Sequence, residues 1–234
     1  QKPYATSWTL GGTTRASETL TIPTAGVFQK GNWAVELTYI SKIVAYSNYP
    51  RLFHCGIDAN NYYDIAITPD GRIYGEVRSE GTNYALFSSP IVVGTAYSIM
   101  FSGDGTCIRL CINGLEYSRL YVEPIGTLLS SVNIGSSSSK QCNGIIDDLR
   151  ISNRARTLAE HQSAYQSNQP LAVDTSTTCK LNFDGSLDAI GVGPTPTRFI
   201  YDYNNRLDYI EMPSGGVIDY QYDANGNLIR RTIH

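Results

Sequence analysis

Short runs of alternating apolar and polar residues recur along the first 190 residues of the chain, and turn-forming residues separate them. In NWAVELTYISK, residues 32–42, Trp33, Val35, Leu37 and Tyr39 share one face, which is the period of a half-buried β-strand. Further runs (YYDIAIT, RIYGEVR, AYSIMFS and CIRLCI) are joined or followed by PDG, GDG and NG, which are typical hairpin turns. Strands at short, regular spacing with almost no helix predict an all-β, two-sheet antiparallel sandwich.

Alternation also divides the middle strands into two faces. The apolar face, expected in the core, contains Ile65, Ile67, Ile73, Val77, Ile99, Ile108, Leu110 and Ile112. The opposite face is polar and aromatic, and its candidate ligand-binding residues are Tyr62, Asp64, Tyr74, Glu76, Arg78 and Arg109. Aromatic rings stack on the apolar faces of sugars while charged groups hydrogen-bond sugar hydroxyls, so this face is a candidate sugar platform.

Two other interpretations of the polar face stay open. It is equally compatible with a solvated sheet surface, or with a surface covered by the C-terminal tail. The loop aromatics Tyr46, Tyr49 and Tyr84 form a second candidate site, because the rim loops of sandwiches commonly carry binding residues. The sequence does not choose between the sheet face and the loops.

The stretch NGIIDDLRIS, residues 143–152, combines a strand pattern with an adjacent acid pair. A helix is predicted near residues 157–165, because Thr157 followed three residues later by Glu160 forms a capping box. Strand alternation sends Asp147 and Asp148 to opposite faces, which makes them a poor catalytic pair. One of them is free to hold an ion, unless backbone amides or Arg150 satisfy it.

Composition excludes several classes of partner and chemistry. A net charge of −3 provides no strong electrostatic attraction for nucleic acid. The sequence contains no run of about 20 apolar residues, so membrane insertion is not predicted. Five cysteines cannot all pair, and no zinc spacing occurs, so mostly free thiols are expected. None of the three histidines lies near a nucleophile; His161 is expected on the helix surface and His54 in a strand without a chemical role.

The C-terminal region is expected to be separate from the sandwich. Residues 191–197 (GVGPTPT) have the composition of a linker between a sandwich at 1–190 and a tail at 198–234. In the tail, YDYNNRLDYI from Tyr201 aligns with YDANGNLIRR from Tyr222, and each copy reads as strand, turn and strand. Two copies are too few for a stable array, so the tail should pack on the sandwich, pair with another chain or be partly mobile.

Two family resemblances follow from these motifs. Through GNWAVELTYI, DIAITPDGRIYGEV, LCING and GIIDDLRISNRART, residues 15–190 resemble laminin-G-like, concanavalin A-like jelly rolls of bacterial surface, secreted and phage tail proteins. Through YDANGNLIRRT, residues 198–234 resemble the tyrosine-aspartate (YD) repeats of Rhs-type proteins. The jelly-roll resemblance implies carbohydrate or protein binding and a structural calcium ion, for which Glu18, Asp147 and Asp148 are the candidate ligands.

The jelly-roll resemblance does not imply catalysis. Related β-glucanases carry E-x-D-x-x-E on one strand, and no such stretch occurs here. We therefore expect a non-catalytic binding module of a large bacterial or phage extracellular protein, with a polysaccharide or glycan as ligand and the rest of a longer repeat-containing chain as partner. The alternative is a structural or assembly module of an Rhs-type surface protein or phage tail, without a small ligand.

Overall fold

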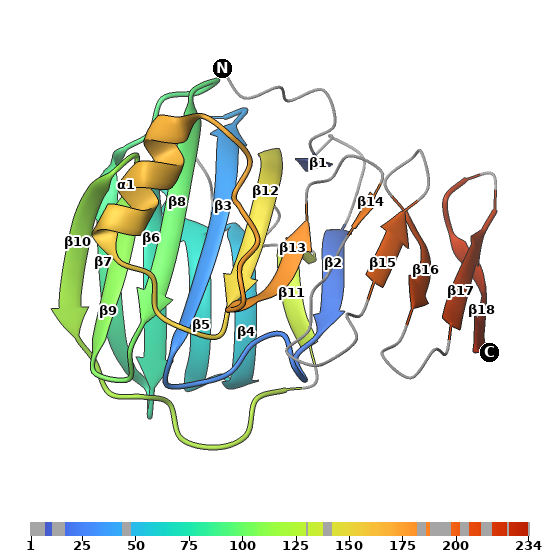
Figure 1. Ribbon diagram of the computed structural model, residues 1–234, viewed down its shortest axis with the longest axis horizontal. Helices are drawn as coiled ribbons and strands as arrows, with labels where there is room; N and C mark the ends of the chain where they lie inside the picture. The colour runs from blue at the N-terminus through green and yellow to red at the C-terminus, as the bar shows by residue number, and fades with distance from the viewer. Residues whose placement is uncertain are drawn as a thin grey trace.

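The structure is a computed structural model that describes residues 8–10, 17–43, 48–129, 131–137, 142–181, 186–187, 198–201, 206–211, 217–223 and 225–233. Two antiparallel sheets face each other and a third lies beside them, and the one helix within these described ranges lies on the outside (Figure 1). The all-β sandwich predicted from the sequence is therefore confirmed.

The first sheet has the strand order β2-β11-β4-β5-β6-β7. Its strands are β2 (Ser17–Pro23), β4 (Arg51–Asp58), β5 (Asn61–Ile67), β6 (Arg72–Ser79), β7 (Thr82–Pro90) and β11 (Ser131–Ser137). The second sheet has the order β1-β12-β3-β8-β9-β10, and β13 also pairs with β12. Its strands are β1 (Trp8–Leu10), β3 (Trp33–Ser41), β8 (Ala96–Gly103), β9 (Cys107–Ile112), β10 (Leu115–Leu120), β12 (Gly144–Ser152) and β13 (Thr177–Leu181).

The core lies between these two sheets. All eight apolar residues assigned to it from the alternation pattern are buried, as are Trp33, Val35, Leu37 and Tyr39. At its centre the Trp33 ring packs against Tyr63 and Phe101, with centroid distances of 5.3 and 5.0 Å. Such edge-on aromatic packing adds to the hydrophobic term and fixes the spacing of the sheets.

Hairpin turns connect neighbouring strands as the sequence predicts. Asn113 and Gly114, with φ of 50° and 84°, join β9 to β10, and Glu80 and Gly81, with φ of 48° and 80°, join β6 to β7. Two successive residues with positive φ are what a tight turn between right-twisted strands requires. The Glu80–Gly81 turn fixes the register of β6 with β7, which matters for the site below.

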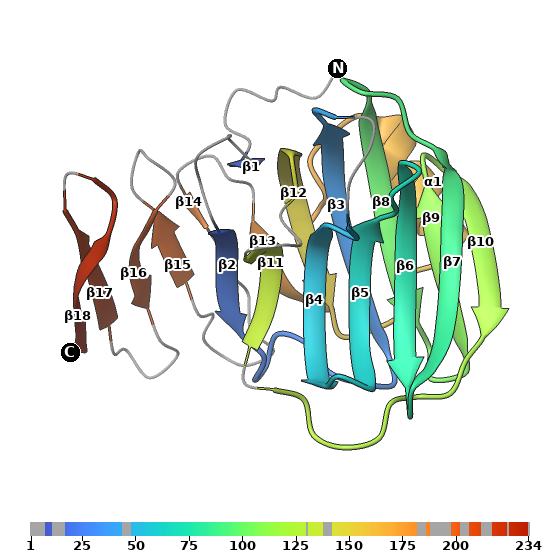
Figure 2. The ribbon, with the colours of Figure 1, turned by 180° about the vertical axis from the view of Figure 1, so that it is seen from behind.

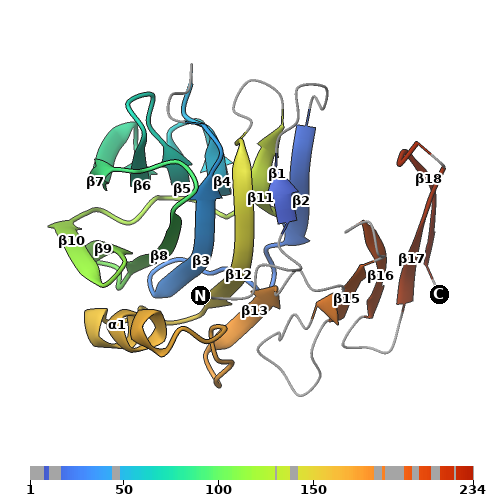
Figure 3. The ribbon, with the colours of Figure 1, turned by 90° about the horizontal axis from the view of Figure 1, so that it is seen from above.

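The helix α1 (Leu158–Ser167) lies on the outer face of the second sheet (Figure 3). Thr157 caps it, and the predicted capping box with Glu160 is present. The expectation that His161 lies on the helix surface is wrong, because its side chain is only 1% exposed. The helix rests flat on a strand face that is itself polar, and His161 is the one residue of α1 that is fully buried there.

The third sheet has the order β14-β15-β16-β17-β18 and stands beside β2 (Figures 1 and 2). Its strands are β14 (Ser186–Leu187), β15 (Arg198–Tyr201), β16 (Leu207–Glu211), β17 (Val217–Tyr222) and β18 (Leu228–Ile233). The first sequence copy coincides with the end of β15 and with β16, and the second with the end of β17 and with β18, whereas residues 202–205 of the first copy lie outside the described residues. The sheet also takes in β14, from before the expected linker at 191–197, which itself lies outside the described residues.

Candidate functional site

Five of the six predicted ligand-binding residues come together on one sheet face. In the β5–β6 pairing Tyr62 lies opposite Arg78, Asp64 opposite Glu76, and Ala66 opposite Tyr74. The alternate residues of the same strands, such as Tyr63, Ile65 and Val77, belong to the core. Because side chains alternate across a strand, the predicted residues face away from the core.

Aromatic rings form a row along this face. The Tyr74 ring lies 5.7 Å from Tyr49 and 5.1 Å from Phe87, measured between ring centroids. Tyr49 and Phe87 stay 47% and 44% exposed, which is unusual for rings of this size. Tyr74 between them is only 8% exposed, so the row presents ring surface to solvent through Tyr49 and Phe87.

A cavity of about 460 Å³ opens between these rings. Its lining consists of Tyr49, Tyr62, Asp64, Tyr74, Glu76, Asn83, Ala85 and Phe87. Aromatic walls combined with a few convergent polar groups are typical of a small-ligand site. The cavity also joins the two sites that the sequence kept apart, since Tyr49 comes from the loop before β4 and the other residues come from the sheet.

The carboxylate of Asp64 lies at the floor of the cavity, only 4% exposed, and basic groups hold it there. Arg51 Nε donates to Asp64 Oδ2 at 2.9 Å, and His54 Nδ1 lies 2.5 Å from Oδ1. The sequence did not predict this contact of His54 with a residue of the cavity. Sequence alternation missed it because the pairing of His54 with Asp64 depends on the β4–β5 register.

The second carboxylate, Glu76, is 3% exposed and sits beside Tyr62, whose hydroxyl donates to Glu76 Oε2 at 3.1 Å. Burial raises the pKa of Glu76 above its ordinary value, and the neighbouring charge of Asp64 raises it further. Burial also raises the pKa of the Tyr74 phenol well beyond its ordinary value. Tyr74 therefore stays a neutral hydroxyl at any physiological pH.

Neither Arg78 nor Arg109 lines the cavity. Arg78 lies next to the cavity, with its guanidinium 5.9 Å from the Tyr62 ring centroid. The placement of Arg109 on the same platform is wrong, because β9 belongs to the second sheet, where Arg109 donates to Asp104 at 3.0 Å. Local alternation shows which residues share a face of one strand, but not which strands share a sheet.

The loop aromatic Tyr84 does not join the cavity lining. Tyr84 packs against the core and lies 6.4 Å from Tyr121 between ring centroids. Tyr46 lies outside the described residues. Of the two loop aromatics that the structure describes, Tyr49 lies with the sheet-face residues and Tyr84 does not.

The candidate metal residues occupy two different sheets. Glu18 is on β2 of the first sheet, and Asp147 and Asp148 are on β12 of the second. The prediction that the adjacent acids point to opposite faces is wrong, because a bulge opposite β3 lies between Asp147 and Arg150. Ile146 and Leu149 both enter the core, so both acids between them face outward.

Asp148 is engaged within the chain. Both of its carboxylate oxygens accept from the Leu171 backbone N–H, at 3.0 and 2.9 Å, and Oδ1 pairs with the buried Lys180 ammonium. Arg150, which the sequence offered as its partner, binds Glu36 instead. Among the described residues no group of three or more His, Cys, Asp and Glu side chains is placed to hold a metal ion.

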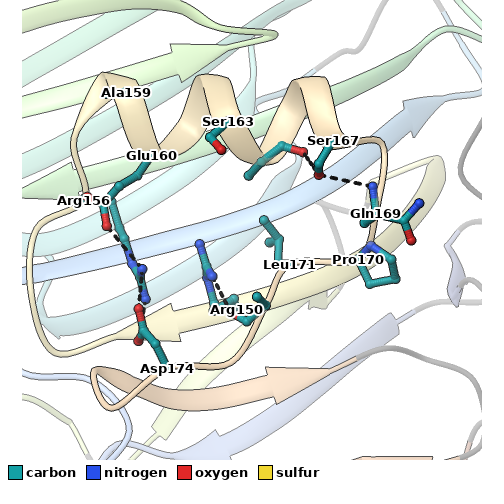
Figure 4. Close-up of a pocket in the computed structure, with 12 residues that line it drawn as sticks. Arg150, Arg156, Ala159, Glu160, Ser163, Ser167, Gln169, Pro170, Leu171 and Asp174 are labelled. Atoms are coloured by element: carbon teal, nitrogen blue, oxygen red, sulfur yellow. Dashed lines mark hydrogen bonds and ion pairs between the residues drawn. The ribbon is translucent and has the colours of Figure 1, made fainter.

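A second cavity, of about 650 Å³, lies between α1 and the segment that follows it (Figure 4). Arg156 crosses its end, donating to Glu160 at 3.4 Å and to Asp174 at 2.7 Å. Although partial burial works to raise it, hydrogen bonds from Arg156 and Ser176 hold the pKa of Asp174 well below its ordinary range. Because the charged groups of this cavity already bind one another, we interpret the cavity as part of the packing interface between the helix and the sheet.

The fold defines a lectin-type β-sandwich, and comparison with known families agrees. A family model described as the concanavalin A-like lectin/glucanases superfamily matches residues 14–160. The chain belongs to this superfamily. A comparison with curated protein sequences finds no match.

Several solved structures share the fold. A SAP-like pentraxin from Limulus polyphemus superposes with a TM-score of 0.50 at 16% identity, covering 67% of this chain and 80% of the pentraxin. The CBM40 of the Ruminococcus gnavus IT-sialidase, bound to α2,6-sialyllactose, gives 0.50 at 12% identity, covering 68% and 96%. A Trypanosoma rangeli sialidase in complex with sialic acid gives 0.54 at 10% identity, covering 72% and 28%. At these identities the likeness shows the fold alone.

Proposed function

We propose that the chain is a non-catalytic carbohydrate-binding module and that the cavity over β5, β6 and β7 is its glycan site. The observation that carries the proposal is the aromatic row of Tyr49, Tyr74 and Phe87 beside the carboxylates of Asp64 and Glu76. The rings offer stacking surface for a sugar, and the polar groups offer hydrogen bonds to its hydroxyls. Sugar complexes of proteins with the same fold support this choice of ligand.

The position of the tail favours an accessible site. The third sheet stands beside β2, whereas β5, β6 and β7 lie at the other end of the sandwich (Figures 2 and 3). The described strands of the tail thus stand away from the aromatic row, which supports an open sheet face over one covered by the tail. A purely solvated sheet face would not be expected to expose two large rings beside a cavity.

A glycan array and a polysaccharide binding screen test the proposal. The native chain should bind at least one glycan class, and Tyr74→Ala should lose that binding because it removes the ring at the centre of the row. Tyr117→Ala, on β10 of the second sheet, is the matched control and should bind as the native chain does. Retention of binding by Tyr74→Ala would move the site elsewhere on the sandwich.

A structural role in an extracellular YD-repeat protein is the second candidate function. It is favoured by β18, an edge strand of the third sheet whose Leu228 and Ile229 are 52% and 64% exposed. An open edge with exposed apolar residues is suited to pairing with a further repeat of a longer chain. Absence of any glycan binding, together with a well-defined oligomer in light scattering, would favour this role.

Calcium binding at Asp147 and Asp148 stays a prediction from the family resemblance. Calcium requires six to eight oxygen ligands, so its binding would have to displace Lys180 from Asp148. A thermal melt with and without chelator tests it. A melting temperature that does not respond to the chelator would rule out a structural ion.

A further inference from the structure

The charged residues that line the cavity are all acidic. Two of its eight lining residues are acidic, Asp64 and Glu76, and none of the eight is lysine or arginine. Both acids lie at the floor, where water screens them poorly. A ligand in this cavity therefore meets carboxylates at close range and no basic side chain within the lining.

The neighbouring basic groups lie outside the lining, although Arg78 is near enough to interact electrostatically with Glu76. The guanidinium groups of Arg51 and Arg78 stand 5.8 and 5.9 Å from the Tyr62 ring centroid, and Arg51 is committed to Asp64. Asp64 is thus already paired within the protein. Glu76 differs, since no salt bridge of 4 Å or less reaches it from the described residues.

One oxygen of Glu76 has no donor of its own. Oε2 accepts from the Tyr62 hydroxyl, whereas Oε1 is buried and accepts no hydrogen bond from the described residues. The Tyr74 hydroxyl is close enough to lower the pKa of Glu76, yet it does not reach Oε1 with hydrogen-bond geometry. A buried acceptor without a donor is uncommon, and a ligand N–H placed at this edge of the cavity would satisfy it.

Aromatic walls around a carboxylate also favour a positive ligand. The faces of Tyr and Phe rings attract a cation within about 6 Å of their centroids. Tyr74 stands beside Glu76 on the same face of β6 and contacts the rings of Tyr49 and Phe87. An ammonium group in the cavity would gain from both the rings and the carboxylate.

We propose that this site selects an amino sugar with a free ammonium group, which donates a hydrogen bond to Glu76 while the sugar ring lies against Tyr49, Tyr74 and Phe87. The inference rests on the proposed carbohydrate-binding function and names its ligand class. A quaternary ammonium does not meet the requirement, because it has no N–H to donate to Oε1. An N-acetylated sugar has the donor but not the charge.

Isothermal titration calorimetry of the full chain at neutral pH tests the proposal with three trisaccharides that differ only at nitrogen. These are the glucosamine, N-acetylglucosamine and N,N,N-trimethylglucosamine trimers. The glucosamine trimer should bind about tenfold more tightly than the other two, which is the ratio expected from one charge-assisted hydrogen bond. Equal affinities for all three trimers would overturn the amino-sugar inference and leave the carbohydrate-binding function intact.

Two variants test whether the preference for the glucosamine trimer depends on the carboxylate of Glu76. Glu76→Gln should lower the affinity for the glucosamine trimer about tenfold and so remove its advantage over the N-acetylated trimer. Glu116→Gln on β10 makes the same charge change on the other sheet and should alter neither affinity. A Glu76→Gln variant that keeps the full preference would also overturn the inference. Failure of every trimer and every other glycan to bind would overturn the carbohydrate-binding function itself.

Discussion

Buried charged residues beneath the helix affect the free energy of unfolding of this protein. Glu36 is 1% exposed on β3, and Arg150 Nε and Nη2 hold its Oε2 at 2.7 and 2.6 Å. Arg150→Met leaves that carboxylate without its main partner, so we expect the free energy of unfolding to fall by about 3–5 kcal/mol. Urea denaturation measures it, and a loss below about 1 kcal/mol would contradict the assigned role. The double variant Glu36→Leu with Arg150→Met should recover much of the loss.

The pairing of Glu36 with Arg150 should also make the free energy of unfolding depend on pH. Burial raises the pKa of Glu36, while Arg150 works to lower it. A carboxyl group whose pKa is higher in the folded state favours folding at low pH and loses that contribution as pH rises through the folded pKa. Removing Arg150 raises this pKa further, so the deficit of Arg150→Met should be smallest at about pH 4 and grow towards pH 7. A deficit that is constant with pH would show that the two side chains are not coupled.

The cysteines allow a test of burial at separate points of the core. All five are free, as the sequence predicts, and burial raises the pKa of Cys55, Cys111 and Cys179 to about 12. Only Cys107 is partly exposed. A thiol reagent at pH 8 should therefore label one cysteine quickly in the native chain, and Cys107→Ser should abolish that phase. Labelling of a second cysteine before unfolding would contradict the packing.

At the scale of strands, one glycine sets how closely the two sheets approach. A Cβ atom at Gly75 on β6 would lie 2.8 Å from two carbons of the Phe101 ring on β8. Gly75→Ala should consequently destabilise the fold by about 1–3 kcal/mol through overpacking. Thermal or urea unfolding measures the loss. Gly75→Ala combined with Phe101→Leu should be less destabilised than the sum of the single changes, and strict additivity would exclude the contact as the cause.

Strand periodicity also explains which parts of the site could be foreseen. Tyr62 with Asp64 and Tyr74 with Glu76 are spaced by two residues on adjoining hairpin strands, so local alternation and a short turn were sufficient. Arg109 obeys the same alternation but lies on the other sheet, which only the pairing of distant strands decides. His54 and Phe87 reach the site because of the registers in which β4 and β7 pair with their neighbouring strands. The bulge after Asp147 changes the face to which Asp148 points. None of these has a local sequence signal.

Across the whole molecule, the sandwich and the third sheet differ in how much they bury. Among the described residues of the third sheet only Ile210 and Ile218 are buried hydrophobic side chains, whereas the sandwich encloses a core drawn from both of its sheets. Regions that bury few apolar contacts open more easily. The sequence anticipated this contrast, because two repeats offer each other too little surface to bury.

Hydrogen exchange should resolve the two parts in one experiment. Amides of β16, β17 and β18 should exchange well before those of β3, β5 and β8, whose side chains form the core. A bound glycan should slow exchange in β5, β6 and β7, because a ligand that binds only the folded state stabilises it by mass action. It should leave the third sheet unchanged, since that sheet stands at the far side of β2 from the cavity (Figure 2). Protection that spreads equally into β17 and β18 would mean that the tail and the sandwich open as one cooperative unit.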